Sequence, residues 1–232
     1  MAADKHVQVT PARPRLSADR VRAVALQIVD ADGLEALSMR RLAQAVDREP
    51  MTIYRYARNK AALLDGVVEL VLSELHINPS ATDWRKELST LATDFRRLAL
   101  AHPQLVPLLL TRPPATPLGL RPPGTLRPLE NFLQLLINAG FARTDALHAY
   151  RLFFGFLHGH ILGELQELVT DPAETEDLLR LGLHRLPPEE FPQLRTLATE
   201  LAGYDGATQL RRGVQMMILG LQAHFQPTQP ST

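Results

Sequence analysis

The segment from Ser38 to Lys60 reads SMRRLAQAVDREPMTIYRYARNK, and its pattern predicts two short helices joined by a tight turn. Ser38 is suited to cap the first helix, because its hydroxyl can accept an orphan backbone N–H. Leu42 begins an apolar stripe at helical spacing, which predicts an inward face. Pro50 fits the first turn of the second helix, where a missing N–H costs nothing. Ile53 is then the expected inward anchor of that helix.

The positive charges of this segment lie where an isolated helix does not favour them. Arg40 and Arg41 fall in the first turn of the first helix, although the helix dipole favours acids there. The arrangement becomes favourable if an anion docks at that helix end. Two interpretations follow from the residues. The segment is either a DNA-reading helix-turn-helix, or an ordinary helical hairpin with a solvated charged face.

A resemblance favours the first interpretation. The chain contains, in order, ADGLEALS at 31–38, RLA at 41–43, TIYRY at 52–56, NK at 59–60 and LL at 63–64. With this spacing, residues 17–75 resemble the DNA-binding domain of the tetracycline-repressor family of bacterial transcription regulators. Two positions depart from the family pattern. Asp47 stands where the turn usually has glycine, and Tyr54-Arg55-Tyr56-Ala57 stands where Tyr-x-His-Phe is usual.

The resemblance and the charges together give a set of expected DNA contacts. We expect phosphate contacts from Arg40, Arg41, Tyr54 and Lys60, and base-edge contacts from Met51, Thr52 and Arg55. Met51 could touch a thymine methyl group. The full set expected at DNA is Ser38, Met39, Arg40, Arg41, Pro50, Met51, Thr52, Tyr54, Arg55, Tyr56 and Lys60.

Composition limits the possible classes. The 232 residues carry 25 basic and 25 acidic side chains, but residues 1–60 have 11 Lys and Arg against 7 Asp and Glu. A basic head on an acidic body fits a small DNA-binding module joined to a part that does not touch DNA. The chain has no cysteine, which excludes disulfides and thiol chemistry. Neither a signal peptide nor a long apolar run is present, so we expect a cytoplasmic protein without membrane contact.

The apolar periodicity predicts an all-α protein. The resemblance implies a three-helix helix-turn-helix head and a larger helical body for ligand binding and dimerisation. We expect an arm at 1–16, the DNA-binding domain at 17–76, the body at 77–225 and a tail at 226–232. The arm is either a plain mobile terminus or a DNA-reaching segment using Arg13 and Arg15. The expected helices are 17–32, 38–46, a short one from 49, 60–76, 84–101, 104–111, 125–138, 145–169, two within 172–203, and 206–225.

The helix expected at 145–169, capped by Thr144, is apolar nearly all round, which predicts burial on more than one side. Gly155, Gly159 and Gly163 recur at four-residue spacing and permit close helix approach. Gly213 and Gly220 likewise permit close approach of another helix to the helix expected at 206–225. These two helices either form a two-fold dimer interface or belong to the core of one subunit. We expect a homodimer through 145–169 and 206–225, because operator reading by this motif normally needs two heads.

The resemblance extends into the body through DW at 83–84, FRR at 95–97, TRP at 111–113, LE at 129–130 and residues 155–164. It implies a ligand cavity and an inducer. The family's drug is held through magnesium, partly by a histidine, but here that place reads Leu108-Leu109-Leu110. We therefore expect a more apolar ligand and no metal or other cofactor. The expected ligand contacts are His76, Phe95, Leu98, His102, Leu109, Phe132, Phe154, His158 and Glu164.

His158, His160 and Glu164 allow other interpretations. His160 and Glu164 lie four residues apart and could share a metal, but a histidine satisfied inside the core is the commoner case. The alternative function is a helical ligand-binding protein or enzyme that uses these three residues without reading DNA. No nucleophile elbow, phosphate loop or zinc-protease motif supports catalysis. The expected function is therefore a ligand-responsive repressor that binds a palindromic operator as a dimer.

Overall fold

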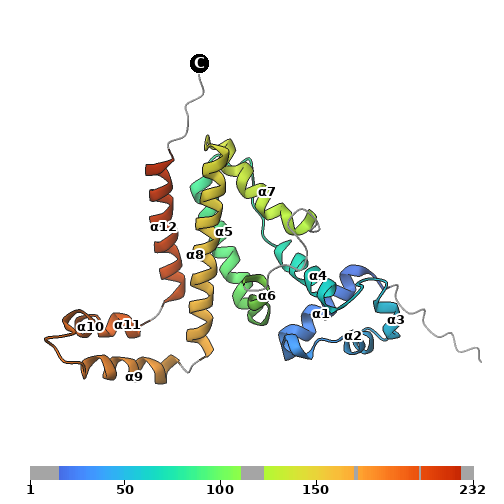
Figure 1. Cartoon of the computed structure of the whole chain (residues 1–232), viewed down its shortest axis with the longest axis horizontal. Helices are drawn as coiled ribbons and strands as arrows, with labels where there is room; N and C mark the ends of the chain where they lie inside the picture. Colours follow the sequence, from blue (N-terminus) through green and yellow to red (C-terminus); the bar gives the residue numbers. More distant parts are fainter. Residues whose placement is uncertain (1–15, 111–122, 170–171, 204, 226–232) are drawn as a thin grey trace, which may run out of the picture. The chain divides into compact units, whose positions relative to one another are not determined.

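The computed structural model describes residues 16–110, 123–169, 172–203 and 205–225, without the side chains of 109–110, 166–169 and 172–176. Every regular element within these residues is a helix, which confirms the all-α prediction (Figure 1). The chain divides into two compact units, Met1–Val67 and Val68–Thr232. We call them the head and the body. Residues 1–15 of the arm predicted at 1–16, the proline-rich residues 111–122 and the tail at 226–232 lie outside the described residues.

The head contains α1 (Ala18–Asp32), the 3₁₀ turn η1 (Leu34–Ala36), α2 (Met39–Ala45), α3 (Pro50–Ile53) and the start of α4 (Lys60–Leu72). The cap predicted at Ser38 is present, and Ser17 caps α1 in the same way. The hydroxyl of Ser17 accepts the N–H of Arg20, and that of Ser38 accepts the N–H of Arg41, each at 3.1 Å. The core of the head is apolar and closed to solvent, and its members include Val21, Ala25, Val29, Leu37, Leu42, Ala43, Ile53 and Leu63.

The turn between α2 and α3 depends on one unusual backbone conformation. Asp47 has φ of 52°, and it is the single non-glycine residue with positive φ in the described chain. Asp tolerates this left-handed region better than most residues. The following N–H, that of Arg48, donates to the carbonyl of Ala43 at 2.9 Å and closes α2. Asp47 therefore keeps the turn at the position where the family pattern usually has glycine.

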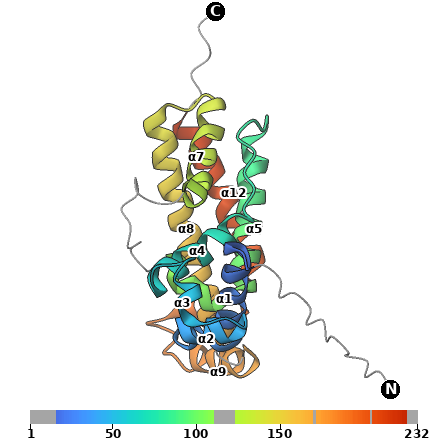
Figure 2. The ribbon, with the colours of Figure 1, turned by 90° about the vertical axis from the view of Figure 1, so that its right-hand side faces the viewer.

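The body is built on α5 (Trp84–Ala101), α7 (Pro123–Asn138), α8 (Arg143–Val169) and α12 (Gly206–His224). Helix α8 packs against the other three, and α12 also packs against α5 (Figures 1 and 2). Their shared core includes Leu88, Phe132, Leu135, Phe153 and Leu157, each 0% exposed. The short elements η2 (Pro103–Leu105) and α6 (Val106–Leu110) follow α5, close to the predicted helix at 104–111.

The segment after α8 differs from the prediction of two helices. It holds α9 (Pro172–His184), α10 (Pro192–Thr196) and α11 (Ala198–Ala202). The helices are interrupted at Leu186-Pro187-Pro188, and a second break occurs at Leu197, where φ of −93° and ψ of 13° leave the helical region. Helix α9 lies alongside α10 and α11 (Figure 1). These three helices form a hairpin that connects α8 to α12 along the chain.

Three predicted helix ends were also wrong. Helix α4 ends at Leu72 instead of residue 76, because the N–H groups of Glu74 and Leu75 bond three residues back and tighten the chain. Thr144 does not cap α8, since the N–H of Ala146 already bonds to the carbonyl of Ala142. Helix α7 begins at Pro123 instead of Thr125, consistent with the preference for proline at the first helical position.

Candidate functional site

The α2–α3 pair presents a polar and basic surface around its buried anchor. Ile53 is 0% exposed, whereas Met51 is 76% and Tyr54 46% exposed. Arg40 and Arg55 are also exposed, and Ser38, Met39, Pro50 and Thr52 have at least part of their surface open. The short α3 therefore holds its place through one apolar side chain while its neighbours remain available to a partner.

Some of the predicted DNA contacts are already bonded within the head. Arg41 forms an ion pair with Asp32 at the end of α1. The ammonium group of Lys60 donates to the carbonyl of Leu34 at 3.0 Å, and the hydroxyl of Tyr56 donates to the carbonyl of Leu16 at 2.8 Å. Asp32 is a partner that the sequence analysis missed. These three side chains fasten α2, α4 and the segment after α3 to the rest of the head.

The body brings several of the predicted ligand contacts together in one aromatic cluster. Phe154 on α8 has ring centroids of Phe95, Phe132 and His158 within 6.0, 5.7 and 6.1 Å. Tyr150, which the prediction omitted, lies 4.8 Å from Phe154. Burial lowers the pKa of His158 below its ordinary value of 6.5, because the surroundings disfavour the charged ring.

The remaining predicted ligand residues lie in different settings. Leu98 is 3% exposed on α5, and His102 follows the end of that helix and is half-buried. His76 is exposed, and its Nδ1 lies 2.8 Å from the carbonyl of Glu74. No ring contact joins His76 to the aromatic cluster among the described residues. The side chain of Leu109 lies outside the description.

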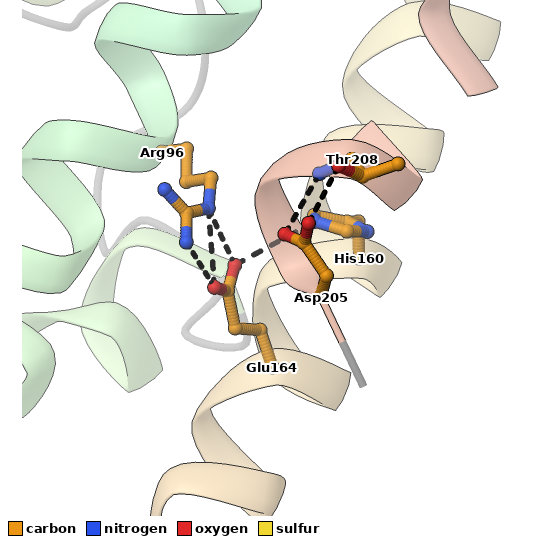
Figure 3. A network of polar contacts seen from close by, with 5 residues as sticks. All are labelled: Arg96, His160, Glu164, Asp205 and Thr208. Atoms are coloured by element: carbon orange, nitrogen blue, oxygen red, sulfur yellow. Dashed lines mark hydrogen bonds and ion pairs between the residues drawn. The ribbon is translucent and has the colours of Figure 1, made fainter. Parts of the chain in front are cut away.

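Glu164 belongs to a buried polar network instead of the aromatic cluster (Figure 3). Its carboxylate is 5% exposed and receives N–H donors from Arg96 on α5, with Nε at 3.1 and 2.8 Å from the two oxygens and Nη2 closer still. Nε2 of His160 lies 3.6 Å from the same carboxylate and has no hydrogen-bond partner among the residues that the structure describes. The sequence analysis missed Arg96 as the partner, although a carboxylate on an apolar helix requires a cation nearby.

The first residue of α12 closes this network. A Cβ added at Gly206 would lie 2.3 Å from Oε1 of Glu164, so only glycine leaves room for the carboxylate. Asp205 caps the helix, with the N–H of Thr208 donating at 3.0 Å and its hydroxyl at 2.6 Å. The Thr208 hydroxyl, and then its N–H, lower the pKa of Asp205. Three helices thus meet at one buried charge pair.

The magnesium of the tetracycline repressors does not fit these residues. Among the described residues no group of three His, Asp or Glu side chains could hold a metal ion. The carboxylate of Glu164 is occupied by the guanidinium of Arg96, and one carboxylate without partners is a poor magnesium site. The histidine position that the resemblance implies reads as leucine at 108–110.

The glycines of α8 and α12 fall into two groups. A Cβ added at Gly155, Gly159, Gly163 or Gly220 would meet no atom of the described residues within 4 Å. A Cβ at Gly213 would instead lie 2.2 Å from the ring of Phe156, so this glycine allows α8 and α12 to pack within one subunit. Exposed apolar side chains accompany the first group, with Leu152 at 58%, Met216 at 69% and Leu219 at 58%. None of the described helices is long and apolar enough to cross a membrane.

Comparison with known proteins gives matches to both the head and the body. A family model described as bacterial regulatory proteins of the tetR family matches residues 21–67, and one described as the tetracyclin repressor-like C-terminal domain matches residues 78–225. The tetracycline repressor protein class E of Escherichia coli is 33% identical over 199 residues, which cover 84% of this chain and 89% of that protein.

A second curated relative and a solved structure extend the comparison. An HTH-type transcriptional regulator of Saccharopolyspora erythraea is 28% identical and covers 91% of this chain and 86% of its own. The structure of the Streptomyces coelicolor TetR family protein ActR in complex with actinorhodin superimposes with a TM-score of 0.80 at 30% identity. That match covers 92% of this chain and 99% of ActR.

Proposed function

Because the chain belongs to the TetR family of bacterial transcriptional regulators, we propose that it is a repressor that binds a palindromic operator as a homodimer and is released by a small, largely apolar molecule. As a family member the chain is a DNA-binding regulator and not an enzyme, which removes the catalytic alternative. Residues 17–76 would read DNA, and residues 77–225 would bind the ligand and form the dimer.

The observation that carries the DNA-reading part is the exposure of the side chains around Ile53. Met51, Thr52 and Arg55 would reach base edges, with the Met51 side chain against a thymine methyl group. Arg40 and Tyr54 would contact phosphates. Other members of the predicted set, such as Arg41 and Lys60, have partners within the head, so a phosphate contact from them requires sharing or exchanging that partner.

The dimer proposal is supported by Gly155, Gly159 and Gly163 on α8 and by Gly220 on α12. Within the described part of the chain no side chain covers these glycines, and Leu152, Met216 and Leu219 on the same two helices are exposed. Small residues let helix backbones approach closely, and exposed apolar groups gain free energy when a second copy covers them. A two-fold pairing of these helices would supply the two heads that a palindromic operator needs.

The ligand proposal is supported by the aromatic cluster of the body and by the relatives. ActR was solved in complex with actinorhodin and with (S)-DNPA, so an organic ligand is the expected class for this body. In our proposal the ligand binds more tightly to a state whose heads are spaced wrongly for successive major grooves. Operator and ligand then oppose each other through a coupling free energy that is the same in both directions.

The test is selection of bound sequences from random duplex DNA by the full chain, followed by titration of the selected duplex against salt. A two-fold symmetric motif with a steep salt dependence is the expected result, because several phosphate contacts release counterions. Binding that is weak and indifferent to sequence would refute the proposal for this chain. An Arg40→Ala variant should weaken all selected duplexes by a similar factor.

A further inference from the structure

The chemistry of the ligand can be narrowed from the rings on α5, α7 and α8. We propose that the body binds a flat aromatic molecule carrying a neutral hydroxyl group, with His158 hydrogen-bonded to that hydroxyl and with Phe95 and Phe154 in contact with the ring system. This inference rests on the proposed response to a small molecule, and it names the chemical class of that molecule.

The first support is the spacing of the rings. The centroids of Phe95, Phe154 and His158 form a triangle with sides of 6.0, 5.9 and 6.1 Å. The ring centroid of Phe154 also lies 5.7 Å from that of Phe132 and 4.8 Å from that of Tyr150. These separations fall in the range of favourable aromatic pairs, about 4.5–7 Å. A flat aromatic ligand can therefore join the cluster through the interactions that already hold it together.

The second support is the gradient of burial across the cluster. Phe132 and Phe153 are 0% exposed and Phe95 is 5% exposed, so this end belongs to the core. Phe154 and His158, one turn apart on α8, are only half-buried. The cluster is thus closed on its core side, while the two α8 rings retain surface that an added ring could cover. Covering such apolar surface is favourable at about 25 cal/mol per Å².

The third support is the hydrogen-bonding state of His158. Across the described residues neither of its ring nitrogens has a hydrogen-bond partner, and burial keeps the ring neutral by lowering its pKa. A neutral imidazole offers one donor and one acceptor, and a polar group left unpaired in apolar surroundings is unfavourable. A hydroxyl, which both donates and accepts, complements this ring whichever tautomer is present.

The charges nearby favour a neutral ligand. Among the described residues Glu164 is the one buried carboxylate, and it is already paired with Arg96. His160 stacks on Phe156 at 5.9 Å and faces that same carboxylate. The charges of Arg96 and Glu164 therefore compensate each other within the protein. An ionised ligand beside His158 would lose its hydration without gaining an opposite charge. A phenol-like hydroxyl loses less and regains a hydrogen bond.

The experiment compares two probes, 2-naphthol and naphthalene, which differ only in the hydroxyl. Their dissociation constants are measured with the full chain at pH 7.5 by calorimetry or by probe fluorescence. We expect 2-naphthol to bind more tightly by about 2- to 10-fold, the effect of one net hydrogen bond. His158→Phe keeps the ring and removes both nitrogens, so it should abolish this preference while leaving naphthalene binding within about 2-fold. His158→Gln, which keeps a donor and an acceptor, should retain most of the preference.

His148→Phe is the matched control, because His148 is exposed on the same helix. It should change neither dissociation constant. The proposal is overturned if His158→Phe and His158→Gln both keep the wild-type preference, or if neither probe binds the wild-type chain. Operator binding is measured on the same preparations, so that a failure of the proposed ligand class can be distinguished from a failure of the proposed regulator function. If the operator is bound but the probes are not, the regulator stands and the aromatic ligand class is wrong.

Discussion

The buried pair of Arg96 and Glu164 offers a sharp test of how the body is held together. We consider Arg96→Met, which removes the guanidinium and keeps an unbranched side chain. The carboxylate of Glu164, 5% exposed, would lose its N–H donors from Arg96. Removing one partner of a buried ion pair typically costs about 3–5 kcal/mol. Since the Arg96 side chain is 25% exposed and water can reach the gap, we expect about 3 kcal/mol.

The reverse substitution and the double variant complete the cycle. Glu164→Met leaves a guanidinium that can turn toward water, so we expect a smaller loss of about 1–2 kcal/mol. The double variant Arg96→Met with Glu164→Met removes both charges. It should lie within about 1 kcal/mol of wild type, because apolar replacements of buried pairs are often near neutral. The single losses therefore do not add, and the cycle isolates the coupling between the two side chains.

The assay is urea unfolding followed by the fluorescence of Trp84. It is the only tryptophan of the chain, and it is 5% exposed on α5, the helix that carries Arg96. Protein concentration must be held constant, because dimer formation adds to apparent stability. Arg97→Met is the matched control. Its side chain is 58% exposed, and its pair with Asp94 at 3.5 Å should contribute less than about 1 kcal/mol. Equal losses from Arg96→Met and Arg97→Met would refute the reasoning.

Three further predictions address the interface, the DNA surface and pH. Gly159→Ala adds a methyl group that meets nothing within 4 Å in one subunit, so the subunit should gain about 0.5–1 kcal/mol from helix propensity while the dimer weakens. Unfolding and sedimentation measure the two effects, and unchanged dimerisation would contradict the interface. Met51→Ala should lower the discrimination between bases at one operator position by about 1 kcal/mol. Arg40→Ala should instead weaken binding to all duplexes alike and reduce the slope of log affinity against log salt concentration by about one. Fluorescence anisotropy titrations with single-base variants of the operator distinguish these two patterns. Because burial lowers the pKa of His158, the unfolded chain takes up this proton first as pH falls below about 6.5, so stability should decline there and be unaffected above it. His158→Gln should remove that part of the decline, and identical pH profiles of unfolding free energy for both proteins would count against it.

Local signals were sufficient to predict the head. Caps at Ser17 and Ser38, an apolar anchor at Ile53 and a residue at Asp47 that tolerates positive φ depend on near neighbours in sequence. Periodicity also identified the body helices, but not where each one ends. Leu75 keeps the apolar spacing of α4 and is buried, although the last α-helical hydrogen bond is donated by the N–H of Ser73. A side-chain pattern reports which face is buried and does not report which carbonyl each N–H bonds to.

Long-range pairing accounts for most of what the sequence could not provide. Arg96 and Glu164 are separated by 68 residues, and the sequence does not say which cation meets which acid. The same holds for Gly206, which resembles an ordinary helix start until the position of the Glu164 carboxylate is known. Four of the residues predicted as ligand contacts, Phe95, Phe132, Phe154 and His158, lie in one aromatic cluster, and their contact with a ligand stays a prediction.

The left-handed residue at Asp47 has a consequence for how relatives of this chain are found. The backbone needs φ of 52° at that position, and glycine is the residue that adopts it at least cost. A pattern search that insists on glycine in the turn would reject this sequence, although the conformation that the glycine stands for is present. Searches of genomes for such regulators should therefore accept Asp or Asn there, the other residues that tolerate this conformation.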